Sequence, residues 1–265
     1  MTDDPVVWHY GLMAECWAEF NNDAREAPFF LQEIARFGQP VLDVACGTGR
    51  MLLPLLRAGV DIDGCDISAD MLHHCRRKAA SEGLSPNLYQ QPMHAFDLPH
   101  KYRTIYICDS FDLAGSREKD LETLRRCYAH LEEDGALLLN IQAEYASPEG
   151  WASWLKEKRQ ALPEPWPKEG RRRIASDGSE YVDRFRHIQL DPLDQTFTIQ
   201  VSIEKLQSGR LIASEESALR GNIYFKNELL LILKMAGFRQ ITVRGDYTDE
   251  PATADSVELV FTALR

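Results

Sequence analysis

The strongest constraint on the fold is a short apolar segment that runs directly into a glycine-rich turn. Residues 41–45 are apolar apart from Asp43, and Cys46-Gly47-Thr48-Gly49 follows at once. Residues 50–58 then form a predicted helix that ends at Gly59. Glycine lets the backbone approach a ligand closely, and the N-terminus of a helix is electropositive. The segment therefore predicts a nucleotide-type ligand at residues 41–50.

Strands and helices alternate from this loop to residue 141. Predicted strands lie at 41–45, 60–65, 88–91, 103–108 and 136–141, with helices between most of them. This alternation is typical of a doubly wound, Rossmann-like α/β fold. After residue 225 the chain adds a helix and two strands, at 240–244 and 257–264, with no helix between the two strands. We therefore predict a seven-stranded, mostly parallel sheet with an antiparallel terminal hairpin.

Residues 148–220 interrupt the α/β pattern. Prolines and tryptophans are concentrated at 148–170, and alternating polar and apolar segments follow at 181–190, 196–205 and 211–219. Turn-forming residues join these segments. We predict an inserted antiparallel β-meander at 148–220 that serves as a cap or oligomerisation subdomain. Residues 1–147 and 221–265 form the main domain in this interpretation.

Charge and cysteine content exclude several classes of partner. The formal net charge is −11, which disfavours nucleic acid, and the only basic run, Arg171–Arg173, is predicted to be a solvated loop. Six cysteines without C-x-x-C or metal-site spacing indicate a reducing compartment and no metal. No segment has the length of a membrane span, so a cytoplasmic protein without a membrane partner is expected.

An acidic residue stands in register with the glycine loop. Asp66 ends the second predicted strand, where a carboxylate can accept both hydroxyls of a ribose. The third glycine position of a G-x-G-x-x-G motif is Leu52, which disfavours an NAD or FAD site. Residues 41–50, Asp66 and the segment Ser68–Leu72 closely resemble class I S-adenosylmethionine (SAM)-dependent methyltransferases. A structural alternative is that Asp43 and Asp66 only cap a turn and a helix.

The resemblance implies a SAM site with S-adenosylhomocysteine (SAH) as product. It places Asp43 and the loop at the methionine end, Asp66 at the ribose and Met93 at the adenine. The residues implied to bind the cofactor are Trp17, Asp43, Ala45, Cys46, Gly47, Gly49, Asp66, Ile67, Met71, Met93 and Cys108. Two positions depart from the family pattern, since Ala45 replaces the first glycine and Pro92 replaces a common acidic residue.

The acceptor side is less defined by sequence. Aromatic residues that are candidates to contact the acceptor are Tyr10, Tyr145 and Trp151, with ordinary core packing as the alternative. A general base is needed only if the acceptor must lose a proton. The weak candidates for a base are His9, His94, Asp109 and Asp112, each of which has a structural alternative.

Three functions remain open at this point. The first is in-line methyl transfer from SAM to the N or O atom of a small molecule. The second is a protein or RNA methyltransferase, and the third is a SAM-binding module without catalysis. An open edge of the meander also makes a second copy of the chain a candidate partner.

Overall fold

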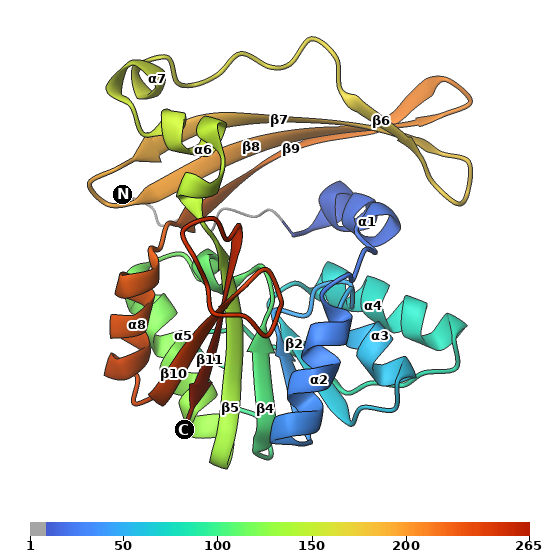
Figure 1. Ribbon diagram of the computed structural model, residues 1–265. Helices are drawn as coiled ribbons and strands as arrows, with labels where there is room; N and C mark the ends of the chain where they lie inside the picture. Colours follow the sequence, from blue (N-terminus) through green and yellow to red (C-terminus); the bar gives the residue numbers. More distant parts are fainter. Residues whose placement is uncertain (1–8) are drawn as a thin grey trace.

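The computed structural model describes residues 9–265, so the first eight residues of the predicted main domain lie outside the described part. Figure 1 shows two parts of the structure, one above the other. A large sheet with helices on both faces forms the lower body. A smaller antiparallel sheet lies across the upper end of that body.

The large sheet has seven strands in the order β10-β11-β5-β4-β1-β2-β3. The strands are β1 (Val41–Val44), β2 (Ile62–Asp66), β3 (Leu88–Gln90), β4 (Tyr102–Ile107), β5 (Leu131–Gln142), β10 (Arg239–Gly245) and β11 (Glu258–Leu264). Strand β11 is antiparallel to both β5 and β10, whereas the pairs from β5 to β3 are all parallel. The predicted fold class, including the antiparallel terminal hairpin, is confirmed.

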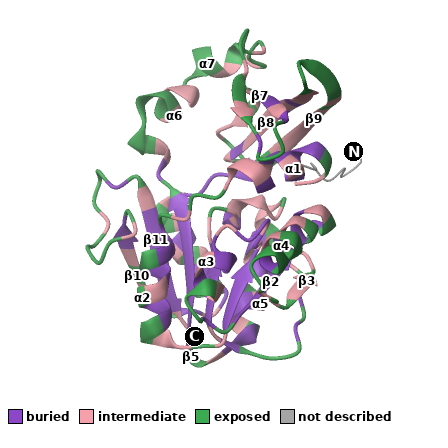
Figure 2. Cartoon of the chain, turned by 90° about the vertical axis from the view of Figure 1, so that its right-hand side faces the viewer, coloured by how far each residue is buried: buried purple, intermediate pink, exposed green. Residues whose placement is uncertain are grey.

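Helices cover both faces of this sheet. They are α2 (Ala27–Phe37), α3 (Leu52–Arg57), α4 (Ala69–Ser81), α5 (Arg117–His130) and α8 (Lys226–Met235). Helices α2, α3 and α4 contribute to one buried cluster, and α5 and α8 contribute to a second one. Val41 and Leu42 belong to different clusters because successive side chains of a strand point to opposite faces. The parallel strands β1, β2 and β4 are therefore buried on both sides, as Figure 2 shows for the interior of the sheet, whereas the edge strand β3 is partly exposed.

The insertion forms a separate antiparallel sheet in the order β6-β7-β8-β9. Its strands are β6 (Arg171–Ile174), β7 (Glu180–Asp191), β8 (Thr196–Gln207) and β9 (Arg210–Asn222). The predicted three-stranded meander is present with one additional strand. Two short helices, α6 (Pro148–Ser153) and α7 (Lys156–Gln160), occupy the proline- and tryptophan-rich segment before it.

The prediction of a loop at Arg171–Arg173 is wrong, because these residues form strand β6, although Arg171 and Arg172 are exposed to solvent as expected. Arg171 lies opposite Asp183 of β7, whose side chain is only 1% exposed. Arg171 and Arg173 both pair with this carboxylate, at 3.0 and 2.6 Å. A buried carboxylate needs such partners, and this requirement is not visible from the arginine run alone.

Helix α1 (Gly11–Phe20) connects the two layers. Its residues Leu12, Met13 and Cys16 pack in one cluster with Tyr181 and Val201 of the antiparallel sheet. On its other side, the Gly11 amide donates to the Asp70 carboxylate of α4 at 2.8 Å. Helix α1 therefore shares its core with the insertion, although it precedes the large sheet in sequence. The boundaries at 147 and 221 stay a prediction.

Candidate functional site

Two neighbouring cavities open at the carboxyl ends of the parallel strands, where ligands bind in open α/β sheets. We call the first the loop cavity, because the glycine loop lines it; its volume is about 750 Å³. We call the second the strand-end cavity, because the ends of β5 and β11 line it; its volume is about 790 Å³. Arg25, Glu26 and Asp109 line both cavities. The two spaces therefore adjoin.

The glycine loop makes a sharp turn between β1 and α3. Ala45, Gly47 and Gly49 all have positive φ angles, of 60, 54 and 84°. A Cβ atom added to Gly47 would meet nothing within 4 Å, whereas one on Gly49 would lie 2.7 Å from the Cys75 sulfur. Gly47 thus leaves space on the cavity side, and Gly49 permits close packing of the loop on α4.

Asp66 is held at the wall of the loop cavity by two backbone amides. Gly47 N–H donates to Oδ2 at 2.9 Å, and Ser68 N–H donates to Oδ1 at 2.8 Å. The first turn of α4 is capped by a different group, since the Ser68 hydroxyl accepts from the Met71 amide at 3.1 Å. Each carboxylate oxygen keeps a further lone pair for a ligand hydroxyl. Burial raises the pKa of Asp66, and the hydrogen bonds from the backbone amides oppose this shift.

Asp43 lies below the same cavity and is only 3% exposed. Its Oδ2 atom has no hydrogen-bond partner within the described structure. Burial raises the pKa of this carboxyl to about 8. A buried carboxylate without a partner is costly in the absence of a ligand. Asp43 is therefore suited to a cationic or hydrogen-bond-donating ligand group.

The structure brings most of the predicted site residues together. Those that line the loop cavity are His9, Tyr10, Trp17, Asp43, Ala45, Cys46, Gly47, Asp66, Ile67, Met71, Met93, His94, Cys108 and Asp109. Asp109 also lines the strand-end cavity, and Asp112 lines only that cavity. Gly49, Tyr145 and Trp151 line neither of them. Trp151 is 52% exposed and Tyr145 is 42% exposed.

The histidine candidates differ in burial. His9 contacts Trp17 edge to face, with ring centroids 6.5 Å apart. Burial lowers the pKa of His9 to about 4, so its imidazole is neutral at physiological pH. Burial also lowers the pKa of His94. Both rings can accept a proton only weakly at their present positions.

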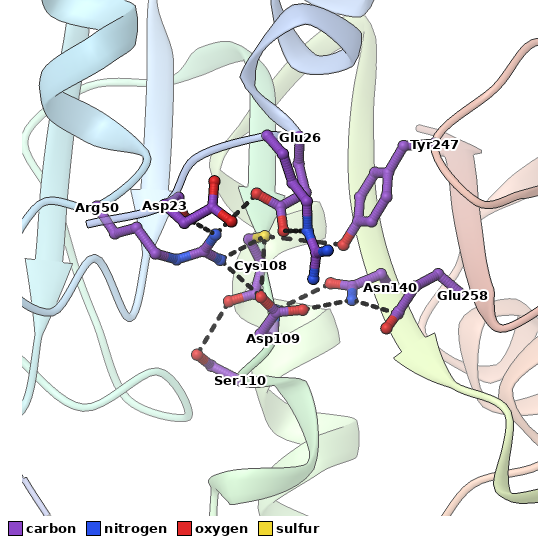
Figure 3. Close-up of polar contacts among 10 residues, drawn as sticks. Asp23, Glu26, Arg50, Cys108, Asp109, Ser110, Asn140, Tyr247 and Glu258 are labelled. Carbon is purple, nitrogen blue, oxygen red and sulfur yellow. Dashed lines mark hydrogen bonds and ion pairs between the residues drawn. The ribbon is translucent and has the colours of Figure 1, made fainter. Parts of the chain in front are cut away.

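A charged network separates the two cavities, and its central residue was not predicted. Arg50, the residue after the glycine loop, lies 2.8 Å from Glu26 and 2.6 Å from Asp109. Its Nη2 atom also lies 3.3 Å from the Cys108 sulfur. Figure 3 shows these side chains converging at the end of β4. Asp109 itself has a φ of 57°, an unusual conformation for a residue other than glycine.

The network continues from Asp109 to the far edge of the sheet. The Asn140 side chain donates to Asp109 at 2.6 Å and to Glu258 at 3.0 Å, and it accepts from the Asp109 amide at 2.9 Å. Asn140 lies near the end of β5 and Glu258 begins β11, and these two strands run antiparallel. Because these two residues are far apart in the sequence, their contact cannot be predicted from the sequence alone. A polar residue near the end of an apolar strand was the one available signal for Asn140.

The segment that builds this geometry is similar to known proteins. Residues 41–135 match the family model described as a methyltransferase domain, and this segment holds the glycine loop, Asp66 and Asp109. Over these residues the chain is similar to a methyltransferase domain. The residues after the matched segment add strands β10 and β11 to the same seven-stranded sheet and form the separate four-stranded sheet.

Three similar proteins illustrate the extent of the likeness. A protein of Geobacillus sp. (strain WCH70) named as a methyltransferase is 29% identical over 122 residues, which cover 44% of this chain and 49% of that protein. The chain thus spans about half the length of this relative. A SAM-dependent methyltransferase structure from Clostridium acetobutylicum aligns over 95% of this chain and 96% of its own, with 17% identity and a TM-score of 0.71. A sugar N-methyltransferase from Streptoalloteichus sp. aligns over 96% and 93%, with 18% identity and a TM-score of 0.69. Because these identities are low, the two structures show only that the chain shares their fold.

Two further features are absent from residues 9–265. No helix within residues 9–265 is long and apolar enough to cross a membrane. In the same part of the chain, no group of three or more histidine, cysteine, aspartate or glutamate residues is arranged to hold a metal ion.

Proposed function

We propose that this protein transfers a methyl group from SAM to a nitrogen or oxygen atom of a small molecule. The observation that carries the proposal is that the glycine loop, Asp66 and Asp43, whose Oδ2 atom lacks a hydrogen-bond partner, surround one cavity. The methyltransferase domain match covers these residues. The same arrangement supports SAM as cofactor and SAH as product.

The loop cavity fits the chemical groups of SAM. The methionine end carries an ammonium group, which gives the Oδ2 atom of Asp43 the partner it lacks. Asp66 stands where it can accept ribose hydroxyls while it keeps its bonds to two amides. Met93 and Met71 supply apolar surface for an adenine ring on the side of β3. Room for a ligand at Gly47 is consistent with this arrangement.

Bound SAM supplies an electrophilic methyl group on a sulfonium, so the chain has to position the acceptor and exclude water. Asp109 and Arg50 stand at the boundary of the two cavities, between the cofactor side and the strand-end side. The tight ion pair and the Asn140 amide fix the Asp109 carboxylate in place. We assign the strand-end cavity to the acceptor for this reason.

The small-molecule acceptor is supported by the shape of the site. Phe197, Asn222 and Tyr224, from the insertion and the segment after it, line the strand-end cavity. The antiparallel sheet of the insertion lies across this end of the large sheet (Figure 1). A sheet in this position restricts access of a macromolecule to the reacting atoms. One of the structures with the same fold is a sugar N-methyltransferase, which is consistent with this choice. A protein or RNA acceptor is the alternative, and the acidic net charge counts against RNA.

Titration calorimetry tests the cofactor assignment. SAM and SAH should bind the wild-type protein with one site per chain. Asp66→Asn should weaken binding by about 1–3 kcal/mol, because it replaces a charged acceptor by a neutral amide. Asp61→Asn, in an exposed position just before β2, is the control and should bind like the wild type. Absence of SAM and SAH binding at millimolar ligand, or unchanged affinity in Asp66→Asn, would contradict the proposed function.

A further inference from the structure

The strand-end cavity is lined by more carboxylates than the cations beside it can pair with. Six acidic side chains border it, namely Glu26, Asp109, Asp112, Glu144, Asp246 and Glu258. Arg50 compensates Glu26 and Asp109. The other four form no ion pair within the described part of the chain.

The basic residue on the cavity wall does not neutralise this group. Arg25 is the single lysine or arginine among the residues that line the strand-end cavity in the described chain. Its side chain is 83% exposed and lies 3.8 Å from Glu26. Its charge is therefore shared with solvent and with a residue that already pairs with Arg50. The inner wall keeps an excess of negative charge.

Neutral donors hold three of the four carboxylates, each from one side. Asn140 donates to Glu258 at 3.0 Å, and the Trp154 indole donates to Glu144 at 3.3 Å. Asp246 accepts the amides of Val257 and Glu258 at 2.9 and 2.8 Å, which orders the loop before β11. These bonds orient the acids and leave their mutual repulsion uncompensated.

Asp112 is the carboxylate with the least local support. It lies in the 3₁₀-helix η1 (Phe111–Leu113), directly after the end of β4, and lines the cavity. No other residue donates a side-chain hydrogen bond to it in the described structure, and it is partly buried. Its Oδ2 atom lies 3.1 Å from the position that a Cβ on Gly221 would occupy, under strand β9. Burial and the nearby Asp120 and Glu144 raise the pKa of Asp112 to about 7.

Repulsion of this kind is relieved when a cation enters the cavity. Burial also raises the pKa values of Glu144 and Glu258, and the neighbouring acid Asp109 raises that of Glu258 further. His187 opposes the shift of the Glu144 pKa, so the repulsion is felt mainly by Asp112 and Glu258. An uncharged acceptor would leave the repulsion in place, and an anionic acceptor would add to it. The cavity also presents neutral polar groups and the ring of Phe197, which suit a polar organic molecule around the charged centre.

We propose that the acceptor binds as an ammonium cation in the strand-end cavity, held between Asp112 and Glu258. The inference rests on the proposed function, because it names the acceptor class of that reaction. It makes amines the substrates, and it excludes phenols, carboxylates and neutral alcohols as preferred acceptors. Asp112 and Glu258 are then residues that determine specificity.

The carboxylates also complete the proton balance of the transfer. An ammonium group has no lone pair, so it must first give one proton to a carboxylate of the cavity wall. The free amine then attacks the methyl carbon, and the carbon–sulfur bond breaks with its electron pair remaining on sulfur. The products are SAH and a methylated amine that again carries one positive charge. The step needs no oxidant or further reactant.

A set of three probes of equal shape and different charge tests the acceptor class. The probes are choline, its neutral carbon analogue 3,3-dimethyl-1-butanol, and the anion 3,3-dimethylbutanoate. Binding is measured by calorimetry or ligand-observed NMR to the full chain saturated with SAH, at about pH 8, above the raised pKa of Asp112, so that this carboxylate is mostly ionised. Choline should bind about 10-fold or more tightly than the neutral analogue, and the anion more weakly still. Equal binding of the three probes, binding of none, or preference for the anion would overturn the proposal.

Matched variants locate the bound cation. Asp112→Asn and Glu258→Gln keep the side-chain shapes and should each weaken choline binding by about 5- to 10-fold. Asp194→Asn, on an exposed turn of the insertion, should leave choline affinity unchanged. Choline binding that survives in both cavity variants would place the cation elsewhere and refute the assignment.

Binding of SAH separates this result from the proposed function. SAH affinity should stay within about twofold of wild type in Asp112→Asn, because Asp112 does not line the loop cavity. Failure of SAH to bind the wild-type protein would contradict the proposed function. Normal SAH binding with no preference for choline would contradict only the acceptor class.

Discussion

The guanidinium group of Arg50 lies 2.6 Å from the carboxylate of Asp109 and so joins the glycine loop to the end of β4. The same guanidinium lies 2.8 Å from Glu26, next to the first turn of α2. One cation thus connects three segments that are distant in sequence, at the boundary between the loop cavity and the strand-end cavity. This contact holds the wall that separates cofactor from acceptor in the proposed function.

Arg50→Ala should therefore destabilise the fold. It leaves Glu26, whose side chain is 7% exposed, without a counter-charge. We expect the free energy of unfolding to fall by about 1–3 kcal/mol, less than for a fully buried pair because Asp109 is half exposed. Urea denaturation measures the change. Arg57→Ala, which removes a surface pair with Glu82, is the matched control and should have a much smaller effect.

The pKa of Asp43 predicts how SAM affinity depends on pH. In the free protein this pKa is raised to about 8, so the carboxyl is mostly protonated below that pH and must lose a proton to pair with an ammonium group. The α-amino group of a ligand has an ordinary pKa of about 7.7–8.0 and must keep its proton. Affinity should therefore rise from about pH 6 to pH 8 and fall again above it.

Proton release is the direct measure of this coupling. At about pH 7, binding should release close to one proton per complex, visible by calorimetry in buffers with different heats of ionisation. Asp43→Asn has no titrating carboxyl and should bind SAM weakly without releasing this proton. Release of the same number of protons by Asp43→Asn would show that another group titrates.

Two glycines with the same backbone angle separate packing from backbone strain. Gly49 and Gly59 have φ values of 84 and 85°. A Cβ on Gly49 would lie 2.7 Å from Cys75 Sγ and 2.9 Å from Leu53 Cγ, whereas one on Gly59 would meet nothing within 4 Å. Gly59→Ala should cost about 1–2 kcal/mol from the left-handed conformation. Gly49→Ala should lower the free energy of unfolding by about 1–3 kcal/mol more than Gly59→Ala, because its Cβ overpacks the contact with α4.

Thermal denaturation of the two glycine variants provides the measurement. A similar loss of stability in both would mean that the loop relaxes without cost and that Gly49 is not required for packing against α4. Gly47→Ala offers a third comparison, since its Cβ would meet no protein atom. We expect Gly47→Ala to weaken SAM binding clearly while it lowers the free energy of unfolding only by the cost of the left-handed conformation.

The insertion should depend on a single buried carboxylate. Asp183 is 1% exposed and accepts from Arg171 and Arg173 of β6. Asp183→Asn should lower the free energy of unfolding by about 2–4 kcal/mol, because it removes the charge that compensates two arginines. Glu180→Gln, which weakens the more exposed pair with Arg172, is the control and should change stability less. Equal effects of both substitutions in urea denaturation would contradict this account.

The predictable part of the fold was the part governed by local pattern. The strand at 41–45, the helix start at Ser68 and the terminal hairpin follow from apolar runs, a capping residue and the missing helix between the last strands. Strand β6 was missed because its three arginines resemble a solvated segment. The carboxylate that makes this strand possible lies in β7, beyond a turn.

The candidate site divides in the same way. The loop cavity is built mainly from residues that follow consecutive strands of one motif, so Asp43, Asp66 and Met93 were identifiable before the structure. Glu258 and Tyr247 line the strand-end cavity from the last hairpin, and Phe197 from the insertion. No local pattern marks these residues, because their role depends on which segments fold over the strand ends.

The sequence by itself determined the class of fold and the position of the cofactor loop, because a glycine turn between an apolar strand and a helix has few structural solutions. Only the tertiary structure decided how the carboxylates meet. It packs α1 against the insertion, joins Arg50 to Asp109, and gathers Asp112 and Glu258 around one cavity. Electrostatic interactions depend on distance and burial, and neither is fixed until distant segments of the chain pack together.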